Sequence, residues 1–191
     1  MTLKKLDSVK FKLILWLFGA IGWSITFFGV IMTQLTKNFT LAELTKSQTG
    51  ARQGLDNTPS PAIEKNLKNL AETILQPLRE KIAKPIVINS GYRSPAVNSA
   101  VGGSATSAHR FGHAVDLIVP SHAGGDVKKL CQYIVKFLKD NNIAFDQVIY
   151  EFGSASNPTQ GWVHIGIKSG NNKQRGQIIT INRKGTFNGI V

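Results

Sequence analysis

Residues 107–119 read SAHRFGHAVDLIV, and the second half of this stretch decides our interpretation of the fold. Ala114–Val119 is apolar except for one carboxylate, which predicts a short buried strand. Successive side chains of a strand point to opposite faces, so Val115 and Leu117 would face the core while Asp116 points away from it. The strand is therefore expected to present Asp116 to a cleft.

A second stretch, GWVHIG at 161–166, shows the same alternation, and His164 would also point away from the core. With His109, in the loop before the first strand, these residues offer two imidazoles and a carboxylate. That is the ligand count of a catalytic zinc, which keeps a fourth position for water and lowers the pKa of that water to about 7. Histidine and aspartate at this spacing also serve as caps and core hydrogen-bonding groups, so spacing alone leaves that alternative open.

A long helix is predicted upstream of these strands. Ser60 followed by Pro61 is typical of a helix start, because the hydroxyl caps free N–H groups and proline lacks one. Pro77 should kink or break the helix near its last turn, and Lys84–Pro85 should end it. Its buried face is marked by Ile63, Leu67, Leu70, Ile74, Leu78 and Ile82.

The remaining pattern completes an α+β fold. Ser47–Ser60 is rich in Gly, Thr, Asn and Pro and is predicted to be a loop. The mixture of helices and strands favours a small, mainly antiparallel sheet with helices packed on one side and zinc in a central cleft. Further helices are expected at Ser94–Val101 and Asp126–Asp140, and strands at Ile86–Ile88, Gln147–Glu151, Gly161–Ile167 and Gln177–Asn182, with the strands ending at Glu151 and Ile167 forming a hairpin.

The N-terminal region is typical of a membrane anchor. Leu13–Met32 is twenty residues without charge, the length that crosses about 30 Å of hydrocarbon. Four lysines and one aspartate precede it, so the positive-inside rule makes residues 1–12 a basic cytoplasmic tail. We expect residues 33–38 to be a linker and residues 39–191 to be the catalytic domain. A cleaved signal peptide is the alternative, but its apolar core would be shorter and no A-x-A-like site follows Met32.

Composition narrows the function classes. The chain has 191 residues, a net charge of +12 and one cysteine. The length suits about one domain plus an appendage. A single cysteine, Cys131, cannot form a disulfide within the chain. It lies in a helical pattern, which is typical of a small core residue. The basic charge suits an anionic cell envelope or nucleic acid. No helix-turn-helix, zinc-finger spacing or aromatic RNA-binding motif is present, so no specific nucleic acid is expected.

Several ordered motifs carry a resemblance to one enzyme family. Besides the two stretches above, they are FTLAEL at 39–44, GLDNTP at 54–59, SGYRSP at 90–95, GGS at 102–104 and FDQVIYEF at 145–152. The chain resembles the zinc D-Ala-D-Ala carboxypeptidases and L-alanyl-D-glutamate endopeptidases, which are murein peptidases, in a branch common in bacteriophages and their hosts. The resemblance implies Zn²⁺ as cofactor, with His109, Asp116 and His164 as its ligands.

The resemblance also implies roles for other residues. Arg93 matches the family's substrate-polarising arginine and Ser107 a substrate-contacting hydroxyl. Many relatives carry a carboxylate base three residues before the last histidine, where this chain has Gly161. Glu151 on the preceding strand is the best substitute, because the hairpin would place it on the face of His164. The alternatives are a loop salt bridge for the arginine, a turn hydrogen bond for the serine and a surface charge for the glutamate.

These expectations define one function and its rivals. The chain would be a membrane-anchored zinc metallopeptidase that hydrolyses stem-peptide bonds of peptidoglycan, as an endolysin-like phage enzyme or a bacterial envelope enzyme. Its domain would be periplasmic or otherwise extracytoplasmic, or anchored in a virion membrane, with peptidoglycan and the lipid around Leu13–Met32 as partners. The main alternative is a peptidase-like protein that binds murein or builds a virion without turnover. Gly161 favours that alternative, and retention of all three ligands opposes it. A third hypothesis, a DNA-binding membrane protein, is supported only by the net positive charge.

Overall fold

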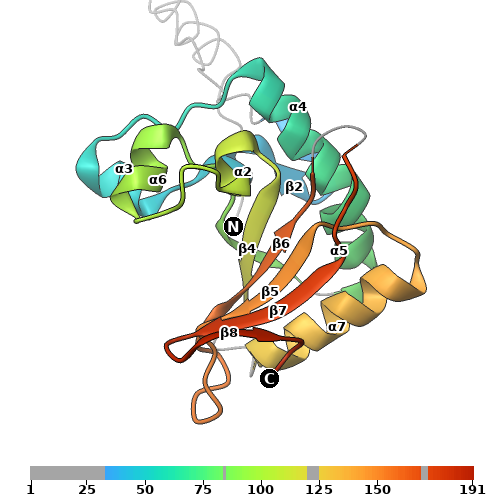
Figure 1. Cartoon of the computed structure of the whole chain (residues 1–191). Coiled ribbons are helices and arrows are strands. Elements are labelled where there is room, and N and C mark those ends of the chain that lie inside the picture. The colour runs from blue at the N-terminus through green and yellow to red at the C-terminus, as the bar shows by residue number, and fades with distance from the viewer. Residues whose placement is uncertain (1–32, 84, 120–124, 169–171) are drawn as a thin grey trace, which may run out of the picture. The chain divides into compact units, whose positions relative to one another are not determined.

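The computed structural model describes residues 33–83, 85–119, 125–168 and 172–191, which belong to one compact unit (Figure 1). The expected basic tail and the expected anchor at Leu13–Met32 lie outside these residues. Within the described part of the chain, no helix combines the length and the apolar character needed to span a bilayer.

A six-stranded sheet with the order β3-β4-β6-β5-β7-β8 runs through the unit (Figure 1). Its strands are β3 (Val87–Ser90), β4 (Ala114–Ile118), β5 (Gln147–Glu151), β6 (Trp162–Gly166), β7 (Gln177–Asn182) and β8 (Gly185–Asn188). The expected hairpin is present, because β5 and β6 pair antiparallel. The sheet is mixed rather than purely antiparallel, since β5 and β7 run parallel.

The parallel pair follows from the place where the chain after β6 meets β5. This segment returns to the beginning of β5, where Gly176 N–H donates to the Phe145 carbonyl (2.9 Å) and Gln177 N–H donates to the Asp146 carbonyl (3.0 Å). β7 therefore starts beside the start of β5 and has to run in the same direction. Nothing in the local apolar pattern of β7 carries this information.

Helices cover one face of the sheet and form the core with it. They are α4 (Pro61–Leu70), the π-helical turn η1 (Ala71–Leu75), α5 (Gln76–Ile82) and α7 (Val127–Asp140). The sheet side of this core consists of alternate residues of the central strands: Val115, Leu117, Val148, Tyr150, Val163 and Ile165. Cys131 is buried here, as expected, and burial raises its pKa to about 12. The residues between the core positions point to the opposite face.

Pro77 is accommodated within the predicted helix. The cap forms as expected, with the Ser60 hydroxyl accepting from Ile63 N–H (3.4 Å). The π-helical turn η1 ends two residues before Pro77, and its wider hydrogen-bond spacing relaxes the backbone where proline has no N–H to donate. The helix continues through α5 and ends at Ala83, which has a left-handed backbone with φ of 54°.

Two segments near residue 33 and residue 50 correct the expected organisation. The segment expected to be a linker contains β1 (Gln34–Thr36), which pairs with β2 (Phe39–Thr40) and buries Leu35. The segment expected to be a loop contains α3 (Gln48–Gln53), capped by Ser47. This helix has no apolar periodicity in the sequence, because its only buried residue is a glycine. Three more short helices complete the unit: α2 (Leu41–Thr45), α6 (Pro95–Ala100) and the 3₁₀ turn η2 (Ala108–Phe111).

Candidate metal centre

Three side chains from two strands and one helical turn converge on the sheet face opposite the helices. Asp116 on β4 and His164 on β6 are direct partners in the antiparallel ladder, so they share a face. His109 comes from η2 and reaches the same point. In sequence, Asp116 is seven residues from His109 and 48 residues from His164, yet the fold brings all three side chains into contact.

The distances among the three ligand atoms suit a metal ion. His109 Nε2 lies 3.2 Å from Asp116 Oδ1 and 3.1 Å from His164 Nδ1. His164 Nδ1 lies 3.0 Å from the same Asp116 oxygen. Zinc bonds of about 2.0–2.1 Å at tetrahedral angles would separate two ligands by roughly 3.3 Å. The triangle is therefore close to one face of a zinc tetrahedron, with a fourth corner left for another ligand.

The orientation of His109 is set by Gly91, which follows β3. His109 Nδ1–H donates to the Gly91 carbonyl at 2.7 Å, so its Nε2 turns a lone pair toward Asp116. A Cβ at Gly91 would lie 2.1 Å from the Leu44 carbonyl oxygen, so only glycine allows this close approach of α2. His109 Nε2 and Asp116 Oδ1 are thus two acceptor atoms that face each other at 3.2 Å, an arrangement that favours a cation between them. The sequence interpretation did not assign Gly91 this role.

The electrostatics keep two of the ligands, His109 and Asp116, in the protonation states that metal binding requires. Burial is the main influence on His109 and lowers its pKa, which favours the neutral imidazole. Burial opposes ionisation of Asp116, but the interactions of its carboxylate with His109 and His164 outweigh that effect. The pKa of Asp116 is therefore held well below its ordinary value. The Asp116 carboxylate is therefore ionised, and the His109 imidazole is neutral and able to bind a metal.

Arg93 lies beside the cluster, as the sequence interpretation requires. Its guanidinium Nη2 is 4.0 Å from Asp116 Oδ2, and its backbone N–H donates to the His109 carbonyl at 3.2 Å. Its Nε is buried and makes no hydrogen bond within the described residues. Arg93, Asp116 and Trp162 line a cavity of about 310 Å³. The arginine side chain therefore lies both beside Asp116 and at the wall of this cavity.

Glu151 lies on the same sheet face as the cluster. It pairs with Trp162, two positions along β6 from His164, and it accepts a hydrogen bond from the Trp162 side chain. Burial and the negative charge of Asp116 raise the pKa of Glu151, and the charges of His164 and Arg93 partly oppose this rise. The predicted base is thus within electrostatic reach of all three residues.

The absence of a carboxylate at position 161 has a steric explanation. Gly161 has φ of 85°, and a Cβ there would lie 2.2 Å from the Glu151 carbonyl oxygen and 2.6 Å from Gly153 N. The backbone of the β5–β6 loop fills the space that a side chain would need. A base must therefore come from elsewhere, and Glu151 is the carboxylate that the register brings near.

Three other polar residues, Ser107, His113 and Asp146, are not members of the ligand triangle. Ser107 precedes η2, and its hydroxyl makes no capping hydrogen bond. His113 is buried and lines a different cavity, together with α4. Asp146 lies just before the first residue of β5, whereas Glu151 is its last residue. The side chain of Arg175 donates two hydrogen bonds to Asp146, its backbone N–H donates a third, and Lys168 Nζ lies 3.4 Å away. Asp146 is therefore engaged in a structural ion pair rather than available as a base.

Comparisons with known proteins agree with this geometry. The model of a family described as Peptidase M15 matches residues 37–143, more than half of the chain. A zinc D-Ala-D-Ala carboxypeptidase of Streptomyces albus G is 38% identical over 81 residues. That similarity covers 42% of this chain and 31% of the relative, so the match spans about a third of that protein. The family match contains His109 and Asp116, and β5 and β6 follow it.

Proposed function

Because the chain belongs to the peptidase M15 family, we propose that it is a zinc-dependent peptidase that hydrolyses peptide bonds in the stem peptides of peptidoglycan. The observation that carries the proposal is the triangle of His109, Asp116 and His164, whose ligand atoms lie 3.0–3.2 Å apart. The donor set of two imidazoles and one carboxylate fits a catalytic zinc. The named relative, a zinc carboxypeptidase that acts on D-Ala-D-Ala, supports the same assignment.

The three ligands would hold Zn²⁺ at the central strands of the sheet. When bound, zinc lowers the pKa of water and polarises a carbonyl group. Gly91 keeps His109 in the tautomer that binds the metal, through the hydrogen bond at Nδ1. The low exposure of the cluster limits competing water, because His109 is 1% exposed and Asp116 5%.

Proton transfer and charge stabilisation fall to two further residues. Glu151 would accept a proton from the attacking water and pass it to the leaving amine. Burial raises its pKa, which makes it a stronger base than an exposed carboxylate. Arg93 would stabilise the charge that develops on the scissile carbonyl oxygen or pair with a substrate carboxylate. Its position in the lining of the cavity beside Asp116 supports this role. Ser107 remains a candidate substrate contact.

We also propose the membrane anchor, on the sequence of Leu13–Met32. Its length and lack of charge support a single span, and the lysines before it favour a cytoplasmic N-terminus. The peptidase domain would then lie in the periplasm or on the outer side of the membrane, near its peptidoglycan substrate. A phage lysis enzyme and a bacterial envelope enzyme both fit this arrangement.

The test is digestion of purified peptidoglycan by the zinc-loaded chain, with mass spectrometry of the soluble products. A mass change matching one cleaved stem-peptide bond is expected, and the fragment mass separates loss of a terminal D-alanine from internal cleavage. The variant His164→Ala is the control. Binding of peptidoglycan without any new fragment would favour the alternative, a murein-binding protein without turnover.

A further inference from the structure

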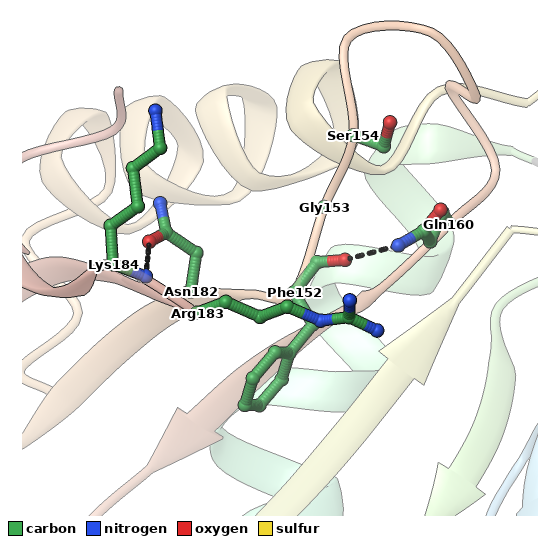
Figure 2. A pocket seen from close by; sticks show the side chains of 7 residues that line it. All are labelled: Phe152, Gly153, Ser154, Gln160, Asn182, Arg183 and Lys184. Atoms are coloured by element: carbon green, nitrogen blue, oxygen red, sulfur yellow. Dashed lines mark hydrogen bonds between the residues drawn. The ribbon is translucent and has the colours of Figure 1, made fainter.

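A pocket of about 690 Å³ lies between the β5–β6 loop and the β7–β8 turn (Figure 2). The loop supplies Phe152, Ser154 and Gln160 to its lining, and the turn supplies Asn182, Arg183 and Lys184. The lining combines one aromatic ring, polar groups and two cations, and it contains no carboxylate. The pocket is thus suited to a ligand that is partly apolar and negatively charged.

Phe152 is held in this pocket at an energetic cost. Its φ of 51° is in the left-handed region, which costs a non-glycine residue on the order of 1–3 kcal/mol. Two hydrogen bonds hold the backbone there: Phe152 N–H donates to the Ile181 carbonyl at 2.8 Å, and Gln160 Nε2 donates to the Phe152 carbonyl at 3.2 Å. The result is a large apolar ring that stays 38% exposed. Strain of this kind concentrates at ligand sites.

A contact between two aromatic rings links the pocket to the cavity beside the candidate metal centre. The Phe152 and Trp162 ring centroids are 5.4 Å apart, and Trp162 also lines the cavity beside Asp116. Trp162 is two positions from His164 along β6, a distance of about 7 Å. The pocket therefore lies on the order of 12 Å from the metal ligands, which an extended peptide spans in about three to four residues.

Arg183 is the residue of this pocket that is best placed to bind a negatively charged group. Neither Arg183 nor Lys184 forms an ion pair within the part of the chain that the structure describes. Figure 2 shows the Arg183 side chain extending toward Phe152 and Gln160, whereas the Lys184 ammonium points away from them. A guanidinium binds a carboxylate through two parallel hydrogen bonds. The fork of Arg183 is free for such a partner.

We propose that this pocket binds a carboxylate-bearing residue of the peptide substrate, about three residues from the scissile bond. Arg183 pairs with the carboxylate, and the ring of Phe152 packs against the aliphatic part of the same residue. The inference rests on the proposed peptidase function and adds a contact for a substrate carboxylate that is separate from the one proposed for Arg93.

Two synthetic pentapeptides of one sequence test the pocket: L-Ala-γ-D-Glu-L-Lys-D-Ala-D-Ala, with the α-carboxyl group of D-Glu either free or amidated. In this sequence the free carboxylate is on the third residue before the terminal bond. For the full-length zinc-loaded chain we expect amidation to raise KM about tenfold, the loss of one charge-assisted pair, with kcat unchanged. Arg183→Ala should give both peptides the same high KM, and Arg183→Lys should retain part of the preference. Lys81→Ala, which removes an exposed charge on α5, is the matched control.

The outcomes separate this inference from the proposed function. Equal KM values for the two peptides in the unaltered chain, or a preference that survives Arg183→Ala, would overturn the pocket while leaving the peptidase in place. Calorimetric titration of both peptides into the Glu151→Gln variant, in which hydrolysis is slowed, measures the same preference as binding. Preferential binding of the acidic peptide without hydrolysis by the unaltered chain would contradict the peptidase function and retain the pocket.

Discussion

At the scale of single residues, the metal centre can be tested by replacing one ligand at a time. We expect His109→Ala and His164→Ala to lose bound zinc, because each removes one of three protein ligands from a cluster with no described spare donor. Metal analysis of the purified variants measures this. His113→Gln is the matched control, since His113 lies outside the cluster. Full zinc occupancy in either alanine variant would show that the ligand set is wrong.

Glu151 can be separated from the ligands by a change that keeps its shape. Glu151→Gln should retain zinc and reduce hydrolysis by about 10²–10⁴-fold, because an amide cannot accept the proton of the attacking water. Arg93→Ala should also retain zinc, with activity lost through poorer charge stabilisation. Steady-state rates and metal content are measured together. A rate for Glu151→Gln within about threefold of the unaltered chain, well below that range, would remove Glu151 as the base.

Gly161 should not tolerate the carboxylate found in many relatives. Gly161→Glu combines a positive φ with a clash against the Glu151 carbonyl oxygen, so we expect a loss of at least about 1–3 kcal/mol of stability. Thermal unfolding measures the change, at about 2–4 °C per kcal/mol for a domain of this size. Gly54→Ala is the control, because Gly54 has φ of 63° but open space around its Cβ position. Equal shifts in both variants would contradict the steric argument.

At the scale of secondary-structure elements, β1 extends the catalytic unit toward the N-terminus. A fragment that begins at Thr33 should be more stable than one that begins at Phe39, because the shorter fragment loses β1 and the burial of Leu35. Burying a leucine contributes about 1.5–3 kcal/mol. Urea unfolding of the two fragments measures the difference. Leu35→Ala in the longer fragment should reproduce most of it, and coincident unfolding curves would show that β1 adds nothing.

The register of β4, β5 and β6 is the element-scale feature that assembles the site. Asp116, His164 and Ile149 lie opposite one another, and Glu151 is the next residue on that face. A shift of one residue in either strand pair would move these side chains into the core. The apolar residues on the opposite face oppose such a shift, so the packing of the core also secures the position of the ligands.

At the scale of the whole molecule, the proposed membrane anchor would decide where the activity acts. Leu13–Met32 predicts that the full-length chain stays with membranes after high-salt and carbonate washes, whereas adsorption through its charge of +12 would be reversed by salt. Fractionation followed by N-terminal sequencing tests this. Release into the salt wash, or a mature N-terminus beyond Met32, would contradict the anchor.

The sequence by itself determined much of this protein because the evidence was local. Alternation around Asp116 and His164 indicated which faces they occupy, the Ser60 and Asp126 caps marked two helix starts, and ordered motifs indicated the peptidase family. Each of these signals lies within a few residues of what it predicts, since caps and strand alternation are short-range effects.

Only the tertiary structure decided the features that depend on distant segments. The parallel pairing of β7 with β5 follows from where the chain returns, and α3 is stabilised by its cap and by the contact of a glycine rather than by an apolar stripe. The carbonyl of Gly91 that orients His109, and the backbone that excludes a side chain at Gly161, are likewise properties of packed neighbours. Local patterns carry no distances between distant segments, so these features required the folded chain.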